Sequence, residues 1–292
     1  MKYFFRLAFL GLTLNTTALQ ACDVCGCGSL GFGMGDWINQ GRSMLKTNYS
    51  MRSFEGPLST DYFHQIQLSG IWALENNWQL KFTLPYLYAR REVFETGQMA
   101  SLNSIGDISV SAQKLIWSKI DSNRSHSLYL SGGIQAPTGP FEDRPIESYI
   151  APNFQAGSSS WDFQFSLQYE LAWKDYLLVY QLAHLQNTTN SYDYRFGDQW
   201  LNALKIARPI KLSERYQSML YLGFDYEYLA RDVNKRGFYQ FGTGGQAWFG
   251  GLGYQIMNES WSLGIQYQFR PLPALGQYQA KDQLNINFSY FL

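Results

Sequence analysis

Charged residues are scarce in this chain. They make up 16% of its 292 residues, against about 25% in typical soluble domains. The 23 basic and 23 acidic residues cancel, and like charges form no run. The electrostatic footprint of a nucleic-acid-binding protein is therefore missing.

Long apolar runs are also missing beyond the first twenty residues. A transmembrane helix needs about 18 consecutive apolar residues, and no later stretch approaches that length, which excludes a helical membrane protein. Aromatic side chains nevertheless form 17% of the chain, while its mean hydropathy is only −0.27. Apolar residues must therefore be interleaved with uncharged polar ones.

The N-terminus has the three-part layout of a secretory signal. Basic residues near Met1 precede the apolar stretch 7–14, and a polar tail ends in Ala21. This layout predicts a signal peptide over 1–21 and a mature chain that begins at or close to Cys22. The residues around this point also resemble a lipoprotein cleavage site, at which the cysteine is acylated. Ordinary cleavage and lipid anchoring both stay open.

The segment 161–174 carries the clearest secondary-structure signal. Every second residue from Trp161 to Trp173 is aromatic or leucine, and most residues between them are polar. Successive side chains of a strand point to opposite faces, so this alternation predicts a strand. About thirteen residues alternate, whereas soluble strands usually have about 5–6 and membrane-spanning strands about 9–11. Aromatic residues near both ends are typical of a transmembrane barrel.

The same alternation begins again at Trp78, Trp261 and Leu284. Weaker candidate strands lie near 43–52, 62–73, 106–118, 125–136, 176–186, 199–210, 216–230 and 246–256. Together they predict about twelve strands, with ten to fourteen possible, and bacterial barrels have even numbers. The aromatic residues expected to face lipid include Trp78, Tyr88, Trp161, Trp173, Trp261 and Phe288.

Connections between these segments alternate between short and long. The long ones lie near 53–61, 89–105, 137–160, 187–198, 231–245 and 271–282. Outer-membrane barrels combine short periplasmic turns with long external loops, whereas a soluble β-sandwich, the alternative, has no reason to sort its loops. We therefore predict an all-β fold, a transmembrane antiparallel up-and-down β-barrel over 43–292. A Cys- and Gly-rich periplasmic segment is expected at 22–42.

The end of the chain supports a location in the outer membrane of a Gram-negative cell. Phe288, Tyr290 and Leu292 alternate with polar or aromatic residues up to the last position. This resembles the C-terminal signal that barrel-assembly machinery reads. Outer-membrane lipid and this machinery are thus expected partners.

Two short motifs resemble those of a known family. Gly106-Asp107 opens one predicted strand, and Gly132-Gly133 followed by Pro137-Thr138-Gly139 closes the next. The combination resembles the outer-membrane transporter family named for the meta-pathway of phenol degradation, over about 60–292. The resemblance implies an outer-membrane β-barrel that passes small molecules. From the residues themselves, Pro137-Thr138-Gly139 is expected to end a strand and turn the chain outward.

The three cysteines are clustered as Cys22, Cys25 and Cys27. Neighbouring thiolates favour soft ions such as Cu(I), or zinc. A disulfide between two of them is equally consistent with an oxidising envelope, and acylation of Cys22 would leave two ligands. Metal site, disulfide and anchor all stay open.

The histidines give little support for an enzyme. His126 lies between two serines, as a base beside a nucleophile would, but in a predicted short turn where serine is common. His64 and His184 share strand faces with tyrosine and leucine, which favours packing or a place at the membrane interface. No spacing indicates a catalytic triad, so a lipid hydrolase is the less favoured alternative.

The polar faces of the predicted strands would line the barrel interior. The inward residues are expected to include Lys81, Asp107, Gln113, Gln164, Gln168, Glu170, Asp225, Glu227, Gln266, Asn285 and Asn287. Neutral amides dominate this set and acids outnumber bases, which argues against an anion-selective pore. We expect passage or binding of a small neutral or cationic solute, and the family resemblance adds aromatic ones. The rival is a structural or adhesive barrel that acts through its long loops.

Overall fold

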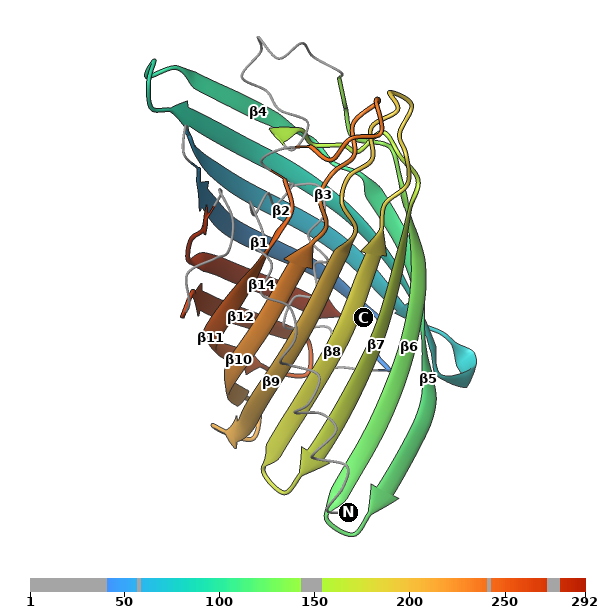
Figure 1. Ribbon diagram of the computed structural model, residues 1–292. Coiled ribbons are helices and arrows are strands. Elements are labelled where there is room, and N and C mark those ends of the chain that lie inside the picture. Colours follow the sequence, from blue (N-terminus) through green and yellow to red (C-terminus); the bar gives the residue numbers. More distant parts are fainter. Residues whose placement is uncertain (1–40, 57–58, 143–153, 241–242, 272–278) are drawn as a thin grey trace, which may run out of the picture.

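The protein is a closed antiparallel β-barrel (Figure 1), seen in a computed structural model that describes residues 41–56, 59–142, 154–240, 243–271 and 279–292. Twelve strands form the wall: β1 Met44–Glu55, β2 Ser59–Ala73, β3 Trp78–Val93, β5 Ile108–Asp121, β6 Arg124–Ala136, β7 Asp162–Trp173, β8 Tyr176–Gln186, β9 Gln199–Lys211, β10 Gln217–Leu229, β11 Gly245–Met257, β12 Trp261–Phe269 and β14 Gln283–Phe291. This confirms the predicted fold class and strand number.

Three short elements complete the described chain. Strand β4 (Met99–Ile105) extends the sheet beside β3, and β13 (Gln279–Ala280) pairs with the end of β1. A 3-10 turn, η2 (Glu75–Asn77), joins β2 to β3. Within the described residues, no helix has the length and apolar character needed to cross a membrane.

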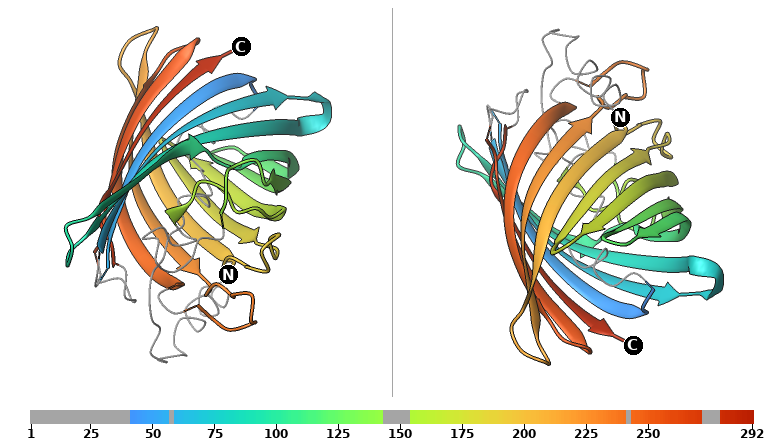
Figure 2. Two further views of the ribbon diagram at one scale, coloured as in Figure 1. Left: turned by 90° about the horizontal axis from the view of Figure 1, so that it is seen from above. Right: turned by 90° about the horizontal axis from the view of Figure 1, so that it is seen from below.

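The barrel closes because β1 pairs on both sides. It pairs with β2 along its whole length and with β14 from Met44 opposite Phe291 to Met51 opposite Leu284. Beyond this ladder, the Leu292 N–H donates to the Ser43 carbonyl oxygen over 2.9 Å. Figure 2 shows the resulting ring of strands from above and below. Closure leaves no free edge in the barrel wall, which a spanning sheet requires in lipid.

Apolar side chains cover the outside of the barrel, and polar ones face inward. In β12, Leu263, Ile265 and Tyr267 are 45–48% exposed, whereas Gln266 and Gln268 are at most 7% exposed. Such a surface is unfavourable in water and suits a hydrocarbon surround. Among the aromatic residues predicted to face lipid, Trp261 is partly covered by Tyr216; the exposed ones are Trp78, Tyr88, Trp161, Trp173 and Phe288.

One of the predicted long connections is wrong, because β1 ends at Glu55 and β2 already begins at Ser59. The connection predicted near 89–105 is long but starts later, since β3 continues to Val93 and the chain then forms β4 before β5. Charged and polar residues occupy both faces near these turns, so the hydrophobic alternation stops before the backbone pairing does. The long connections after β6, β8 and β10 meet at the upper end of Figure 1, and the short turns β5–β6, β7–β8 and β9–β10 lie at the lower end.

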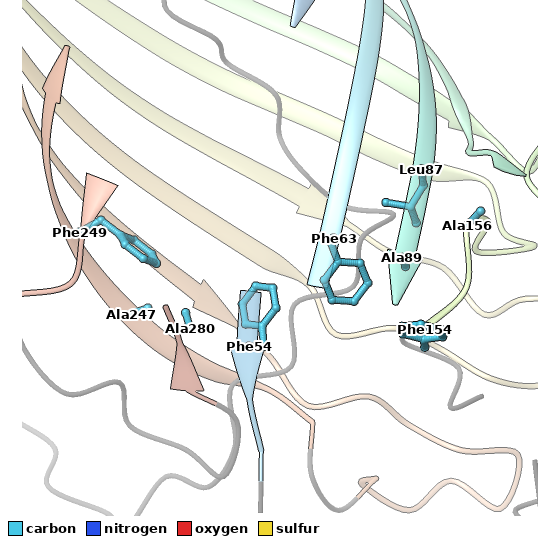
Figure 3. Packing of buried hydrophobic residues seen from close by; sticks show 9 residues of the cluster. All are labelled: Phe54, Phe63, Leu87, Ala89, Phe154, Ala156, Ala247, Phe249 and Ala280. Atoms are coloured by element: carbon cyan, nitrogen blue, oxygen red, sulfur yellow. The ribbon is translucent and has the colours of Figure 1, made fainter. Parts of the chain in front are cut away.

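The interior at the long-loop end of the barrel holds an apolar cluster (Figure 3). Its members are Phe54, Phe63, Leu87, Ala89, Phe154, Ala156, Ala247, Phe249 and Ala280. The Phe63 ring of β2 lies 5.7 Å from that of Phe54 in β1 and 5.8 Å from that of Phe154 in the connection after β6, so two other segments contact it. Smaller apolar groups, one of them around Met219 and Tyr221, lie near the short turns. The polar inner wall thus lies between two apolar levels.

A buried ion pair sits against this cluster. Arg91 on β3 donates from Nε to Asp61 Oδ1 over 2.7 Å and from Nη2 to Oδ2 over 2.6 Å. Both side chains are at most 8% exposed, and the guanidinium lies 4.8 Å from the centre of the Phe154 ring. Two parallel hydrogen bonds satisfy the carboxylate, which is the geometry in which a buried pair is tolerated.

The Arg91–Asp61 pair should contribute strongly to the stability of the barrel at its long-loop end. Replacing Asp61 with Ala removes the carboxylate from a buried guanidinium and should lower the free energy of unfolding by about 3–5 kcal/mol. Urea unfolding in detergent micelles measures the change. The double variant Asp61→Leu/Arg91→Leu removes both charges and should lose much less. Equal losses in the two variants would contradict the buried-charge explanation.

Candidate functional site: the barrel interior

The structure places all eleven predicted interior residues on the inner side of the wall. Ten of them alternate with outward neighbours along a strand, as Asp225 does with the exposed Phe224, and Asp107 lies between β4 and β5. The buried members are Asp107, Gln168, Asp225, Gln266 and Asn287. Partly exposed members are Lys81, Gln113, Gln164, Glu170, Glu227 and Asn285.

Several inward charges were missing from the predicted set. Lys46 and Arg52 lie on the inner face of β1, and Lys205 lies on that of β9. The Arg91–Asp61 pair is also on the inner side of the wall. Lys46 alternates with the outward Leu45 and could have been found from the same period of two. Bases therefore accompany the acids, and with the inward Asp162 also counted the two are nearly equal in number. The argument against anions from an excess of acid is correspondingly weaker.

A chain of hydrogen bonds runs along the inner face of the wall from β14 through β12 to β10. Asn285 donates from Nδ2 to Gln268 Oε1 over 3.0 Å, and Gln268 donates from Nε2 to Asp225 Oδ2 over 2.5 Å. Strand β11 lies between β12 and β10, and its residue at this level is Gly251. A Cβ at Gly251 would lie 3.4 Å from Gln268 Cγ and 3.1 Å from Gln266 Nε2. The missing side chain gives these amides room to lie along the wall.

An ion pair also joins distant parts of the ring. Arg52 Nη2 on β1 lies 3.8 Å from Glu227 Oε1 on β10, and both side chains are 21–25% exposed. Strands β14, β12 and β11 separate β1 from β10 around the wall. The two side chains therefore span a chord of the interior instead of meeting along neighbouring strands. Any solute that moves through this level must pass beside both charges.

Much of the inner wall has unused hydrogen-bonding capacity. Within the described part of the chain, both amide atoms of the buried Gln255 and Gln283 have no partner. Asn48 Oδ1, Asn287 Oδ1 and Ser289 Oγ also have no partner. The register brings Asn48, Asn287 and Gln255 to one level, whereas Gln283 lies two inward positions further along β14. An unpaired buried polar atom costs about 1–3 kcal/mol. This patch gains most from a polar molecule that can both donate and accept.

The two motifs that suggested a family resemblance contact one another. The Asp107 carboxylate accepts from the Gly139 N–H over 2.8 Å and from the N–H and Oγ of Ser158, each over 2.7 Å. Thr138 Oγ1 accepts from the Ile108 N–H over 2.9 Å. A Cβ on Gly157 would lie 2.1 Å from the Gly139 carbonyl oxygen, so glycine is required there. The motifs form one structural unit that ties the connection after β6 to β5.

This unit also holds the returning part of the connection inside the mouth. Strand β6 ends at Ala136 as predicted. Phe154 and Ala156, further along the same connection, are buried against Leu87 and Ala89 of β3 (Figure 3). The two hydrogen bonds from Ser158 to Asp107 hold Ser158 inside the mouth. The described part of this connection narrows the interior at the long-loop end.

Acidic side chains also hold the neighbouring loops. Asp162 accepts from the Thr188 N–H over 2.8 Å, and Asp198 accepts from the Asn187 N–H over 2.9 Å. In the next loop, Asp232 accepts from the Gly197 N–H over 2.7 Å and from the Tyr194 hydroxyl over 2.6 Å. Backbone bridges join the same loops. The result is an ordered loop layer, residues 187–198 and 231–240, above the barrel mouth.

The three histidines lie on the outer face of the barrel. His126 is in β6, not in the predicted turn, and its Nδ1 lies 2.7 Å from the Tyr169 hydroxyl. His64 Nδ1 lies 2.8 Å from the Tyr49 hydroxyl, and the His184 ring stacks on Trp200 at 4.0 Å. Ser125 and Ser127 point to the opposite face from His126. Each histidine is packed against an aromatic residue, in keeping with the packing interpretation.

The predicted metal ligands Cys22, Cys25 and Cys27 lie outside the described residues, as do the signal peptide and nearly all of the segment 22–42. In the part of the chain that is described, no three His, Cys, Asp or Glu side chains form a possible metal site. The cysteine cluster therefore stays a prediction from sequence.

The order of the loop layer should depend on pH through Asp232. Burial raises the pKa of this carboxyl from about 3.8 to about 6, although the hydrogen bonds from Tyr194 and Gly197 oppose the rise. The ordered loop binds the proton more tightly than the open loop, so its stabilisation is complete below about pH 4 and is lost as the pH rises through about 6. A shift of two pKa units corresponds to roughly 100-fold in the opening equilibrium.

Hydrogen exchange of residues 187–198 and 231–240 measures this effect. Protection in the wild type should fall between pH 4 and pH 7, after correction for the intrinsic exchange rate. Asp232→Asn should remove the pH dependence. A wild-type loop layer with constant protection across this range would refute the role of Asp232.

Comparison with known proteins supports the architecture. No protein-family model and no curated protein matches the sequence. The fold is similar to that of an outer membrane channel from Pseudomonas putida F1, with a TM-score of 0.68, 12% identity, and coverage of 89% of this chain and 99% of that one.

Two autotransporter barrels are also similar. The β domain of Bordetella BrkA has a TM-score of 0.53 and 12% identity, with coverage of 86% of this chain and 100% of that one. The transport unit of AIDA-I from Escherichia coli has a TM-score of 0.52 and 10% identity, with coverage of 90% and 94%. At these identities the likeness concerns the fold. The chain thus has the twelve-stranded architecture of outer-membrane β-barrels.

Proposed function

We propose that this protein is an outer-membrane channel for small polar solutes. The observation that carries the proposal is the polar inner wall, in which buried amides and hydroxyls retain unpaired donors and acceptors. A passing molecule with hydroxyl or amide groups gains hydrogen bonds there, whereas an apolar one gains none. The similar Pseudomonas putida F1 protein is itself described as an outer membrane channel.

The size of the barrel supports a passage more than a solid core. Eight strands enclose a space that side chains just fill, and sixteen to eighteen leave an open aqueous channel. Twelve strands lie between these cases. Inner glycines such as Gly223 and Gly251 let the side chains of Gln266 and Gln268 lie along the wall on one flank. The segment at 154–160 narrows the interior at the mouth. A narrow passage follows from this combination.

The charges of the interior favour neutral or zwitterionic solutes and small ions of either sign. Arg52 and Glu227 face one another across the passage, and Lys205 balances Asp225 nearby. Preference for cations, expected from the first set of inward residues, loses its basis once these bases are included. Aromatic solutes rest on the resemblance to the meta-pathway transporter family.

The orientation completes the proposal. The outer membrane of a Gram-negative cell would hold the barrel, with the short turns and the N-terminus in the periplasm. The length difference between the two sets of connections supports this placement, because such barrels keep short turns on the periplasmic side.

Conductance in planar bilayers tests both the channel and the effect of the Arg52–Glu227 pair on ion selectivity. Wild-type protein should conduct small ions with weak selectivity. Arg52→Gln leaves Glu227 without its cation and should raise the cation-to-anion permeability ratio about twofold, while Glu227→Gln should lower it by a similar factor, because rings of charge set selectivity. Glu92→Gln, on the outer face and paired with Arg90, is the matched control and should change nothing.

Two outcomes would contradict the proposal. A wild-type barrel that folds but neither conducts nor allows liposome swelling would favour the structural or adhesive alternative. That alternative draws support from the ordered loop layer, whose bridges between Arg195, Val233 and Tyr239 would present a fixed surface. Loss of adhesion after deletion of 231–240, with unchanged conductance, would transfer the function to the loops.

The cysteine cluster forms a separate part of the proposal, a soft-metal site at the N-terminus. Cys25→Ser/Cys27→Ser should abolish binding of Cu(I) or Zn(II) by the purified protein and leave the barrel intact, because thiolates are the preferred ligands of these ions. Metal analysis and the mass of the mature N-terminus measure the outcome. A diacylglyceryl mass on Cys22 would indicate an anchor, and the loss of two hydrogens a disulfide.

A further inference from the structure

Four residues form a row on the outer face of the barrel near the short turns. Arg124 of β6 is the register partner of Trp173 in β7, which is the partner of Tyr176 in β8. The register of β8 and β9 then brings Arg208 beside Tyr176. The row therefore runs cation, aromatic, aromatic, cation across four adjacent strands, which lie side by side in Figure 1.

The cations in this row lie over the aromatic rings. The Arg124 guanidinium carbon is 5.6 Å from the Trp173 ring centre, and that of Arg208 is 5.9 Å from the Tyr176 ring centre. Lys174, in the turn after β7, places its Nζ 5.4 Å from the Trp173 ring. We call these five residues the cation–aromatic patch.

The positive charge of the patch is not neutralised by the rest of the described chain. Arg124, Lys174 and Arg208 form no ion pair with any residue of the described ranges. Asp121, the register partner of Arg124, is paired with Lys119 over 3.5 Å. Asp175 shares the turn with Lys174, so three cations face one acid and the patch is net positive.

The surroundings of the patch define what it faces. Trp173 and Tyr176 are 43% and 47% exposed, and the three cations are exposed as well. Toward the middle of the barrel, the outer face continues with exposed apolar residues such as Leu204 and Ile206. A charged zone thus borders an apolar zone, which matches the boundary between lipid headgroups and acyl chains.

We propose that the cation–aromatic patch binds the phosphate of an anionic phospholipid in the leaflet next to the short turns. Two guanidinium groups suit phosphate oxygens, to which arginine donates in a forked geometry. Tryptophan and tyrosine prefer headgroup depth, where a ring can contact both the phosphate region and the chains. One acyl chain would lie along Ile206 and Leu204. The inference requires the barrel to span a membrane and is independent of solute passage.

Lipid titration of the full-length protein in detergent tests the proposal. The probes are phosphatidylglycerol and phosphatidylcholine with identical acyl chains, and inorganic phosphate. Native mass spectrometry gives the apparent affinity, and thermal unfolding gives the stabilisation. The wild type should retain and be stabilised by phosphatidylglycerol more than by phosphatidylcholine, and inorganic phosphate should have no effect.

The double variant Arg124→Gln/Arg208→Gln should bind phosphatidylglycerol about tenfold more weakly, because each interfacial cation contributes to anionic lipid binding. The control Arg90→Gln/Lys281→Gln removes two exposed cations at the other end of the barrel and should bind as the wild type does. The single variants, each expected to lose about threefold, serve if the double variant does not fold.

Three results would overturn the proposal. The first is equal affinity of wild type and patch variants for phosphatidylglycerol. The second is equal binding of the two lipids by the wild type. The third is full stabilisation by inorganic phosphate, which would assign the patch to a free anion instead of a membrane lipid.

Discussion

Closure of the hydrogen-bonded ring is the constraint on which the rest of this structure depends. In hydrocarbon, an unpaired backbone N–H or C=O costs several kcal/mol. The pairing of β1 with both β2 and β14 leaves the wall without an edge. Once the ring is closed, each residue of a strand has one of two environments. Its position in the alternation decides whether its side chain meets lipid or the interior.

This division explains how the chain tolerates so many polar groups at its centre. Burial of Gln268 and Asp225 is possible because they bond each other across Gly251. Arg91 and Asp61 are buried as a pair with two hydrogen bonds. Where such partners are absent in the described wall, as at Gln255 and Gln283, the capacity to bond a polar molecule remains. Some polar groups of the interior are therefore paired with one another, and others remain able to bond a polar molecule.

The long-loop end is organised by buried carboxylates that accept backbone N–H groups. Asp107 and Asp232 each bind residues of a following or preceding connection, so strand ends and loops become one unit. Glycines at 139 and 157 permit the close backbone approach that this unit needs. The same contacts that order the loops also hold Phe154 inside the mouth. Loop order and the width of the barrel interior at its mouth are thus linked through the same residues.

The sequence by itself determined the strand number, the inward and outward faces, and therefore the fold class. A period of two depends on the geometry of a single strand, so it can be read locally at Trp161 or Trp261. The inward position of Lys46 follows from the same period, because it alternates with the exposed Leu45.

Other features were decided by the tertiary structure. The Arg52–Glu227 pair joins strands on different parts of the ring, and the position of Ser158 inside the mouth depends on Asp107, 51 residues earlier. Neither leaves a local pattern, because both arise from contacts that exist only after the sheet has closed. Alternation along one strand fixes which way a side chain points, and closure fixes what it meets there.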